Sequence, residues 1–347
     1  MLERYKKWIY KWETRLAERD TNRVVRPLEW GLEWTAGWPV VARMTPASAC
    51  GAEEFLCRLN EEVISQSDSF YSYQTPSDFH LDGNSLSFTS PVDSPVAVNN
   101  RVSARWFPAG RRAAVVVLPQ WNADLESHNG LCRLFNRLGI SALRLSMPYH
   151  DERKPPETER SDYAVSSNLG RTLDAARQAV VDIRSCLDWL ESRGYRNLGM
   201  VGTSLGSCYG YLASAHDKRL KVNVFNHCSS TVGDVVWTGQ ATRHIREGIE
   251  GEIDHQRLRR AWMAISPITY AEQFARWPKK SLFIYGRYDL TFLPEFSRKI
   301  IAESARLKLD YQVAILPCGH YTTGETPFKF LDAYYMTSFL NSAFNEI

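Results

Sequence analysis

The segment at residues 202–206 reads Gly-Thr-Ser-Leu-Gly, a Gly-x-Ser-x-Gly pattern. It follows a strand-like run at residues 197–201 and precedes a helix-like run at residues 207–215. A serine at a tight strand-to-helix turn projects its hydroxyl above the sheet, where it can attack a carbonyl carbon. The two glycines suit such a turn because they lack a Cβ that would collide where the strand and helix pass closely. The pattern therefore predicts Ser204 as a nucleophile and the backbone N–H of Leu205 as an oxyanion donor.

Two other residues capable of the remaining chemistry each follow a strand-like run. Asp289 lies shortly after the apolar residues 282–285, and His320 lies shortly after residues 313–316. A serine hydroxyl needs a base to accept its proton and an acid to orient that base. The chain order serine, acid, histidine suits a site at the carboxyl ends of parallel strands. We therefore predict a catalytic triad of Ser204, Asp289 and His320.

Asp234 also follows a strand-like run and is the alternative triad acid.

The elements that must position these residues alternate between strand and helix from residue 113 onward. Their strand-like runs are continuously apolar rather than alternating, as in parallel strands that are buried on both faces. These runs cover residues 113–118, 142–146, 198–202, 222–225, 282–285 and 313–316. The pattern predicts an α/β fold with a doubly wound, mostly parallel sheet.

Two helices are well marked in the sequence. Apolar residues spaced three and four apart predict a helix over residues 172–193, which Gly194 is placed to end. A second helix is expected to begin with Thr326 as its N-cap and Pro327 at the first helical position.

The sheet domain is expected to span residues 86–347. Its first two strands, at residues 86–90 and 96–107, read as antiparallel. Residues 1–85 read as a helical or irregular N-terminal extension. More than fifty residues separate the strands near 226 and 281, which is too long for an ordinary strand-to-helix connection of about 2–6 residues. We therefore expect an inserted helical cap at about residues 230–275.

Composition excludes several classes of protein. The 347 residues are 44% hydrophobic and 23% charged, and the formal net charge of +3 gives no reason to expect a nucleic-acid partner. The seven cysteines have scattered spacings without a CxxC pair, which indicates a reduced interior rather than disulfides or zinc. Charges interrupt every apolar run near the N-terminus, so neither a secretory signal nor a stable membrane insertion is expected. A cytoplasmic location is predicted.

The arrangement of these motifs resembles the α/β-hydrolase superfamily, in its serine esterase type. The serine turn at residues 202–206, the Gly-x-x-Asp that ends at Asp289 and the Gly-His at His320 carry the resemblance, which covers residue 85 to the end. It implies an acyl-enzyme mechanism and, most often, hydrolysis of a carboxylic ester, with no cofactor or metal. The same triad would also serve an amidase, a carbon–carbon bond hydrolase or an acyltransferase, and a non-catalytic binding protein is the remaining alternative.

The resemblance also points to the loop after residues 113–118. Aligned on the strand end, Trp121 falls where the superfamily places its second backbone oxyanion donor, with Gln120 the next choice. We expect Gln120, Tyr149, His150 and Trp237 to contact a small-molecule ester substrate.

Other polar residues have weaker signals. His150, Asp151 and Glu152 resemble a metal-binding cluster, but adjacent residues rarely point at one ion, and no metal site is predicted. His128 and His227 read as ordinary surface or core residues, and Cys318 as a neighbour of the pocket wall. Trp8, Tyr10 and Trp12, which lie among lysines, favour a terminal helix packed on the main domain over one that lies on a membrane surface. A homo-oligomer is compatible with the sequence.

Overall fold

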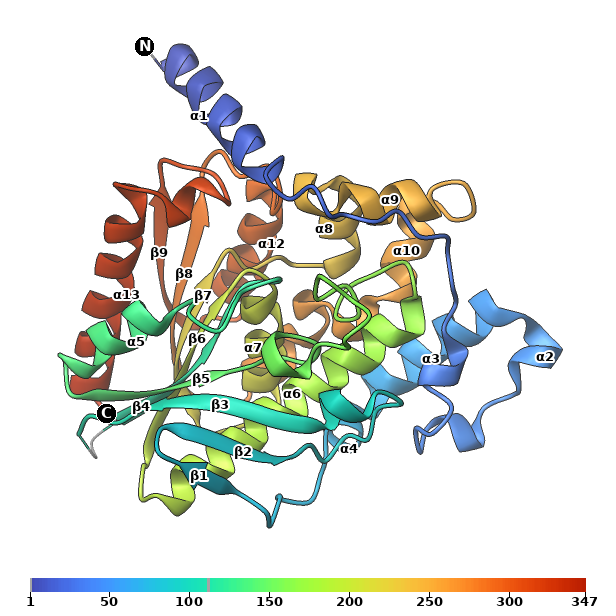
Figure 1. The fold of residues 1–347 in the computed structure, drawn as a ribbon, viewed down its shortest axis with the longest axis horizontal. Coiled ribbons are helices and arrows are strands. Elements are labelled where there is room, and N and C mark those ends of the chain that lie inside the picture. Colours follow the sequence, from blue (N-terminus) through green and yellow to red (C-terminus); the bar gives the residue numbers. More distant parts are fainter. Residues whose placement is uncertain (1, 111–112) are drawn as a thin grey trace.

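The computed structural model describes residues 2–110 and 113–347, and a nine-stranded sheet runs through them in the order β1-β2-β3-β5-β4-β6-β7-β8-β9 (Figure 1). The strands are β1 (His80–Asp82), β2 (Ser85–Thr89), β3 (Arg101–Phe107), β4 (Ala113–Leu118), β5 (Ile140–Leu145), β6 (Asn197–Thr203), β7 (Leu220–Asn226), β8 (Lys280–Gly286) and β9 (Asp310–Leu316).

The sheet is mostly parallel, as the sequence predicts. Strands β4 to β9 pair in parallel, and only β1, β2 and β3 run antiparallel to their neighbours. Every described residue of β4 and β5 is buried, which explains their continuous apolar runs. β1 was not expected, and the second predicted antiparallel strand begins only at Arg101, because Ala97–Asn100 form a 3-10 turn.

Helices cover both faces of this sheet. The described α-helices are α1 (Leu2–Ala17), α2 (Ala47–Cys50), α3 (Ala52–Ser65), α4 (Ser67–Phe70), α5 (Asn129–Asn136), α6 (Leu169–Ser192), α7 (Leu205–Ala215), α8 (Val232–Thr238), α9 (Arg243–Ile249), α10 (His255–Ala261), α11 (Ala271–Phe274), α12 (Pro294–Arg306) and α13 (Phe328–Asn345).

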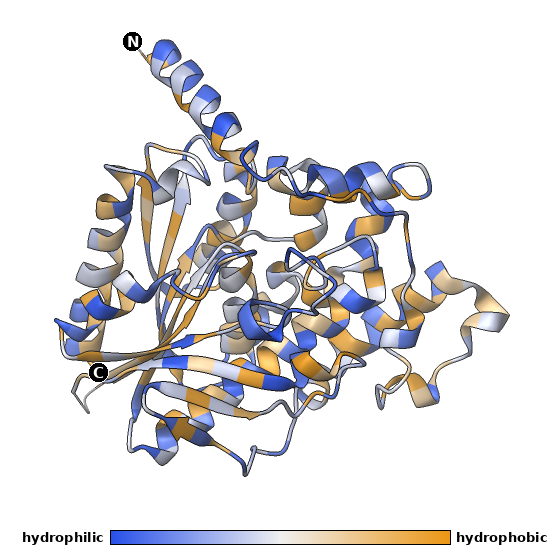
Figure 2. Ribbon diagram, in the orientation of Figure 1, coloured by the Kyte–Doolittle hydropathy of each residue, from blue (hydrophilic) through white to orange (hydrophobic). Residues whose placement is uncertain are grey.

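Two apolar cores result from this layering. One core joins a sheet face to α1, α5 and α13, and the other joins the opposite face to α6, α7, α12 and the cap helices. Figure 1 shows α5 and α13 on one side of the strands and α6 and α7 on the other, and Figure 2 shows that the central strands are largely hydrophobic. The predicted doubly wound α/β fold is therefore confirmed.

The two well-marked helices are present with shifted ends. α6 begins at Leu169, because the side chain of Asn168 accepts a hydrogen bond from the backbone N–H of Arg171 and caps the helix there. α13 begins at Phe328, one residue later than predicted. The carbonyl of Pro327 accepts the N–H of Phe330, which makes Pro327 the capping residue instead of the first helical one.

Four helices, α8 to α11, fill the long connection between β7 and β8. The chain after α1 runs alongside α8 and α9 (Figure 1). It lies so close to α9 that a Cβ on Gly248 would be 1.9 Å from the carbonyl oxygen of Arg26. The N-terminal segment and the cap therefore meet above the sheet.

All seven cysteines are free thiols, six of them buried. Among residues 2–110 and 113–347, none of the helices combines the length and apolar character that a membrane crossing requires.

Candidate active site

Ser204 lies at the turn between β6 and α7, with φ 55° and ψ −120°. This strained backbone is typical of a serine displayed at the top of a sheet. A Cβ on Gly202 would lie 2.5 Å from the carbonyl oxygen of Gly206, and a Cβ on Gly206 would lie 2.5 Å from those of Leu118 and Pro119. Both glycines are therefore required by the close approach of α7 to its neighbouring strands.

His320 and Asp289 reach Ser204 from the loops after β9 and β8. These two strands pair up to Gly286 and Leu316, so both loops start side by side. Ser204 Oγ lies 2.9 Å from His320 Nε2, and His320 Nδ1 lies 2.9 Å from Asp289 Oδ2. The structure thus brings the three predicted residues together in the order that proton transfer from the serine requires.

The carboxylate of Asp289 is fixed on both oxygens. Its Oδ1 accepts the backbone N–H groups of Thr291 and Phe292, each at 2.7 Å. Burial alone would raise the pKa of Asp289, but the charge of His320 and the hydrogen bonds from His227 and His320 outweigh it and hold that pKa well below its usual range. Asp289 is therefore an anion at neutral pH and can stabilise a protonated His320.

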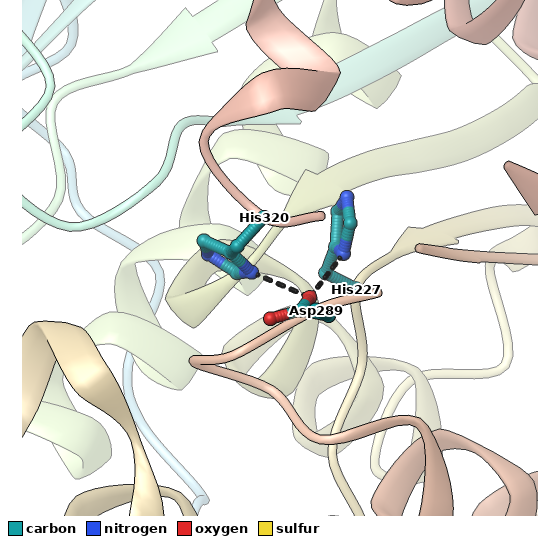
Figure 3. Close-up of side chains that lie close together, drawn as sticks. All are labelled: His227, Asp289 and His320. Atoms are coloured by element: carbon teal, nitrogen blue, oxygen red, sulfur yellow. Dashed lines mark hydrogen bonds and ion pairs between the residues drawn. The ribbon is translucent and has the colours of Figure 1, made fainter. Parts of the chain in front are cut away.

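A second histidine, His227, binds the same carboxylate oxygen (Figure 3). It follows directly after β7, and its Nδ1 lies 2.8 Å from Asp289 Oδ2, while its Nε2 lies 3.0 Å from Thr323 Oγ1. Burial lowers the pKa of His227 below 6.5 despite the opposing hydrogen bond to Asp289, so the ring is neutral. The carboxylate of Asp289 can only accept, so the neutral ring donates to it from Nδ1, which leaves Nε2 without a proton. The Thr323 hydroxyl, 3.0 Å from Nε2, also lies 2.7 Å from the carbonyl of Gly319. Sequence reasoning missed this role of His227.

This cluster is joined by hydrogen bonds whose N···O distances are shorter than the spacing of tetrahedral metal ligands. His227, Asp289 and His320 are the group in the described residues whose ligand atoms lie close enough to hold an ion. Their N···O distances of 2.8 and 2.9 Å are hydrogen-bond distances. Ligands bound tetrahedrally at about 2.0 Å from one ion would lie about 3.3 Å apart. An ion would also have to replace the N–H protons that orient both rings.

The candidate oxyanion hole lies between α7 and the loop after β4. β4 pairs with β6 up to Leu118 and Gly202, which places Gln120 and Trp121 beside the serine turn. In the described parts of the chain, the backbone N–H groups of Leu205 and Trp121 have no hydrogen-bond partner. Both groups are thus free to bind an oxyanion above Ser204.

Neighbouring segments hold this loop in place. The backbone N–H of Asn122 donates to His150 Nε2 at 3.1 Å, and its side-chain oxygen accepts the N–H of Ser161 at 2.7 Å. Trp121 Nε1 donates to the carbonyl of Ser161 at 2.9 Å. The side chains of Trp121, Asn122 and His150 therefore hold the backbone of the loop after β4 in place.

A cavity of about 630 Å³ opens above Ser204, within the usual range of about 300–1,000 Å³ for small-molecule sites. Ser204, His320, Gln120 and Trp121 line it. One wall is aliphatic and comes largely from α8 and the residues near it. It consists of Val165, Val232, Val235, Val236 and Ala241.

Three of the residues expected to contact a substrate, Tyr149, His150 and Trp237, do not line this cavity. His150 is buried, and its two ring nitrogens are occupied by Pro148 and Asn122. Tyr149 is fully buried, and Trp237 stacks on His255 at 5.5 Å between ring centroids. Of the four residues expected to contact a substrate, only Gln120 lines the cavity.

The residues with weaker signals in the sequence make other contacts in the structure. Asp234 lies in the cap and contacts Thr231 and His255, so it does not reach His320. Asp151 pairs with Arg144. Cys318 is buried outside the cavity against Thr323, whereas His128 lines the cavity and lies 3.0 Å from Thr203 Oγ1.

Replacing His227 should change both the rate and the pH dependence of catalysis. His227→Phe removes a hydrogen bond to a charged group, so kcat/KM should fall by about 10- to 100-fold. In the predicted triad, His320 can accept the proton of Ser204 only when its ring is neutral. Burial opposes its charged form, but Asp289 raises its pKa above 6.5, so kcat/KM should rise with pH through a midpoint above 6.5. Loss of the His227 donor leaves more negative charge facing His320, and the midpoint should move higher still.

His227→Asn should retain most of the activity that His227→Phe loses. Its amide nitrogen occupies about the place of Nδ1 and can donate to Asp289 Oδ2 in its stead. His80→Phe, at an exposed position on β1, is the control. Unchanged kcat/KM and an unchanged midpoint in folded His227→Phe would contradict this role.

A comparison with protein families matches residues 129–264 to the model described as "Alpha/beta hydrolase domain containing 18". No curated protein sequence matched the chain. The matched region contains Ser204, His227 and the first helices of the cap, but not Asp289 or His320.

Solved structures with the same fold include two esterases. Acetyl xylan esterase 1 from Thermoanaerobacterium sp. JW/SL YS485 aligns with a TM-score of 0.57 at 13% identity, over 81% of this chain and 93% of that one. An esterase from Pyrococcus furiosus aligns with a TM-score of 0.52 at 12% identity, over 80% of this chain and 94% of that one.

An acylaminoacyl peptidase from Pyrococcus horikoshii aligns with a TM-score of 0.54 at 10% identity, over 78% of this chain but only 50% of that one. At such low identities these likenesses show a shared fold.

Proposed function

We propose that this chain, which shares its fold with two esterases and matches an α/β-hydrolase family model over residues 129–264, is a serine hydrolase that cleaves a carboxylic ester. The observation that carries the proposal is the unbroken hydrogen-bond chain from Ser204 through His320 to Asp289 at the wall of a cavity. A serine hydroxyl becomes a useful nucleophile when such a base is in place. The two esterases with the same fold are consistent with this reaction.

The first half of the reaction acylates the enzyme. His320 Nε2 accepts the proton of Ser204 as Oγ attacks the substrate carbonyl, and Asp289 stabilises the imidazolium that forms. The N–H groups of Leu205 and Trp121 bind the oxyanion of the tetrahedral intermediate. His320 then gives its proton to the leaving alkoxide, and the acyl group stays on Ser204.

Water completes the cycle. His320 removes a proton from a water molecule, which attacks the acyl-enzyme through a second tetrahedral intermediate and releases the carboxylic acid. His320 returns the proton to Ser204 Oγ. Every proton in this cycle moves through His320, so the chain's own side chains supply the chemistry.

The aliphatic wall indicates the kind of group that the cavity accepts. Valine and alanine side chains from the α8 region favour burial of an apolar acyl or alcohol group. The bulky cap residues Trp237, Trp262 and Met263 do not line the cavity.

A comparison of p-nitrophenyl esters with p-nitroanilides that carry the same acyl group tests the reaction class. We expect turnover of the esters, with an initial burst of about one nitrophenol per enzyme if deacylation is the slower step. Added alcohols that divert the acyl group into new esters would identify an acyltransferase. Preferential cleavage of the anilides would identify an amidase, and an absence of turnover and of any acyl adduct would favour a binding protein.

A further inference from the structure

The helix α1 is joined to the loop that carries His320, although about 300 residues separate them in sequence. We refer to residues 317–324 as the histidine loop. Glu13, on α1, is fully buried. Its Oε1 accepts the backbone N–H of Tyr321 at 2.7 Å, and its Oε2 accepts the backbone N–H of Thr322 at 3.0 Å and the Thr322 hydroxyl at 2.9 Å.

These three donors fix the backbone just after His320. Tyr321 and Thr322 begin a 3-10 turn, whose first N–H groups have no partner within the turn itself. Glu13 supplies that partner from another element. Three donors and no acceptor surround its two oxygens, which is the arrangement that suits an ionised carboxylate.

The backbone just before His320 also accommodates Glu13. A Cβ on Gly319 would lie 2.5 Å from the carboxylate carbon of Glu13 and 2.8 Å from the carbonyl oxygen of Tyr288, so a side chain there would displace the Glu13 carboxylate from its place. Tyr5, also on α1, donates its hydroxyl to the carbonyl of Pro317 at 2.5 Å. The N-terminal helix therefore contacts the histidine loop on both sides of His320.

The charge of Glu13 also acts on His320. Burial, and after it the charge of Asp289, raise the pKa of Glu13 above its ordinary value, and the hydrogen bonds from the loop and the charge of His320 offset that rise only in part. Burial opposes the charged form of His320, whereas Asp289 first and Glu13 after it favour that form. His320 thus lies in the field of two buried carboxylates, of which only Asp289 contacts its ring.

We propose that Glu13 is a positioning residue for His320, and that α1 is an integral part of the active site. This inference rests on the proposed serine-hydrolase function. Glu13 acts through the backbone of the histidine loop, and its charge adds to that of Asp289 in stabilising protonated His320 during acylation. Helix α1 thus supports a triad whose three residues come from the sheet domain.

Glu13→Gln is the most informative variant, because it keeps the shape of the side chain while removing its charge. Its NH₂ group must face at least one of the three loop donors, so kcat should fall by about 10-fold with little change in KM. Loss of the negative charge should also move the acid limb of kcat/KM to lower pH. Glu13→Ala, which frees both loop N–H groups, should lower kcat further, by about 100-fold.

The matched control is Glu3→Gln, the same substitution at an exposed position on the same helix, which should leave kcat and the pH profile unchanged. Melting temperatures and the rate of fluorophosphonate labelling should be measured for all variants. A role confined to stability would lower the melting temperature of Glu13→Gln without moving the acid limb.

Wild-type kcat and an unmoved acid limb in folded Glu13→Gln would overturn the inference while the labelled wild type keeps the serine-hydrolase function intact. If neither wild type nor Glu3→Gln reacts with the probe, both the function and this inference fail.

Discussion

Ser204→Ala should lower kcat for ester hydrolysis by a factor of about 10⁶, because no other group can form the acyl-enzyme. Substrate binding should change little, since the cavity wall and the two oxyanion donors remain. The residual rate should stay above that of the uncatalysed reaction, because the backbone N–H groups of Leu205 and Trp121 still stabilise an oxyanion. Steady-state kinetics on a p-nitrophenyl ester measure this change.

Ser65→Ala is the control for that substitution, at an exposed serine on α3 outside the cavity. It should retain the wild-type rate. A folded Ser204→Ala variant that keeps more than about a hundredth of the wild-type kcat would contradict the nucleophilic role of Ser204, given the expected loss of about 10⁶.

Asp289→Asn should lower kcat by about 10⁴, the typical effect of giving the triad histidine the wrong tautomer. Four N–H groups face the two oxygens of Asp289, from His227, His320, Thr291 and Phe292. An amide NH₂ would therefore meet two donors in either orientation. If it faces His320, the ring must accept at Nδ1 and carry its proton on Nε2, where it cannot accept the proton of Ser204.

The same substitution should also reduce stability, because two N–H donors lose their acceptor. Asp310→Asn, at an exposed residue of β9 that pairs with Lys280, is the matched control and should have no effect on kcat. Asp289→Asn activity within tenfold of wild type would indicate that a different carboxylate orients His320. The kcat values and thermal melts of both variants test these expectations.

The sequence predicts the fold and the meeting of Ser204, Asp289 and His320 because each depends on local patterns. Continuous apolar runs mark strands buried on both faces, and parallel strands bring the residues that follow them to one edge of the sheet. The glycines around Ser204 are similarly readable, since each is required by a backbone contact that Gly-x-Ser-x-Gly encodes.

Tyr149 and His150 show where this reasoning fails. They follow β5, at the same edge of the sheet, but the chain turns so that both side chains point into the protein. His150 donates to the carbonyl of Pro148 and accepts from Asn122, and it thereby fixes the oxyanion loop without lining the cavity. Position after a strand predicts the edge of the sheet but not the direction of the side chain.

The sequence contains a signal for the role of His227 and for the role of Glu13, but the tertiary contacts are needed to interpret both signals. His227 directly follows β7, so it obeys the same rule as Asp289 and His320. Glu13 lies on the buried stripe of α1 together with Ile9, Leu16 and Ala17, at helical spacing. A charged residue within an apolar stripe calls for a buried partner. The identity of that partner, a loop about 300 residues away, follows only from the packing of α1 on the sheet domain.

Mass-spectrometric mapping of the protein after reaction with a fluorophosphonate shows directly whether Ser204 is an activated nucleophile. We expect one adduct at neutral pH, on the peptide that contains Ser204, absent from Ser204→Ala and present in Ser65→Ala. An adduct on another residue, or equal labelling of the Ser204→Ala variant, would contradict this expectation.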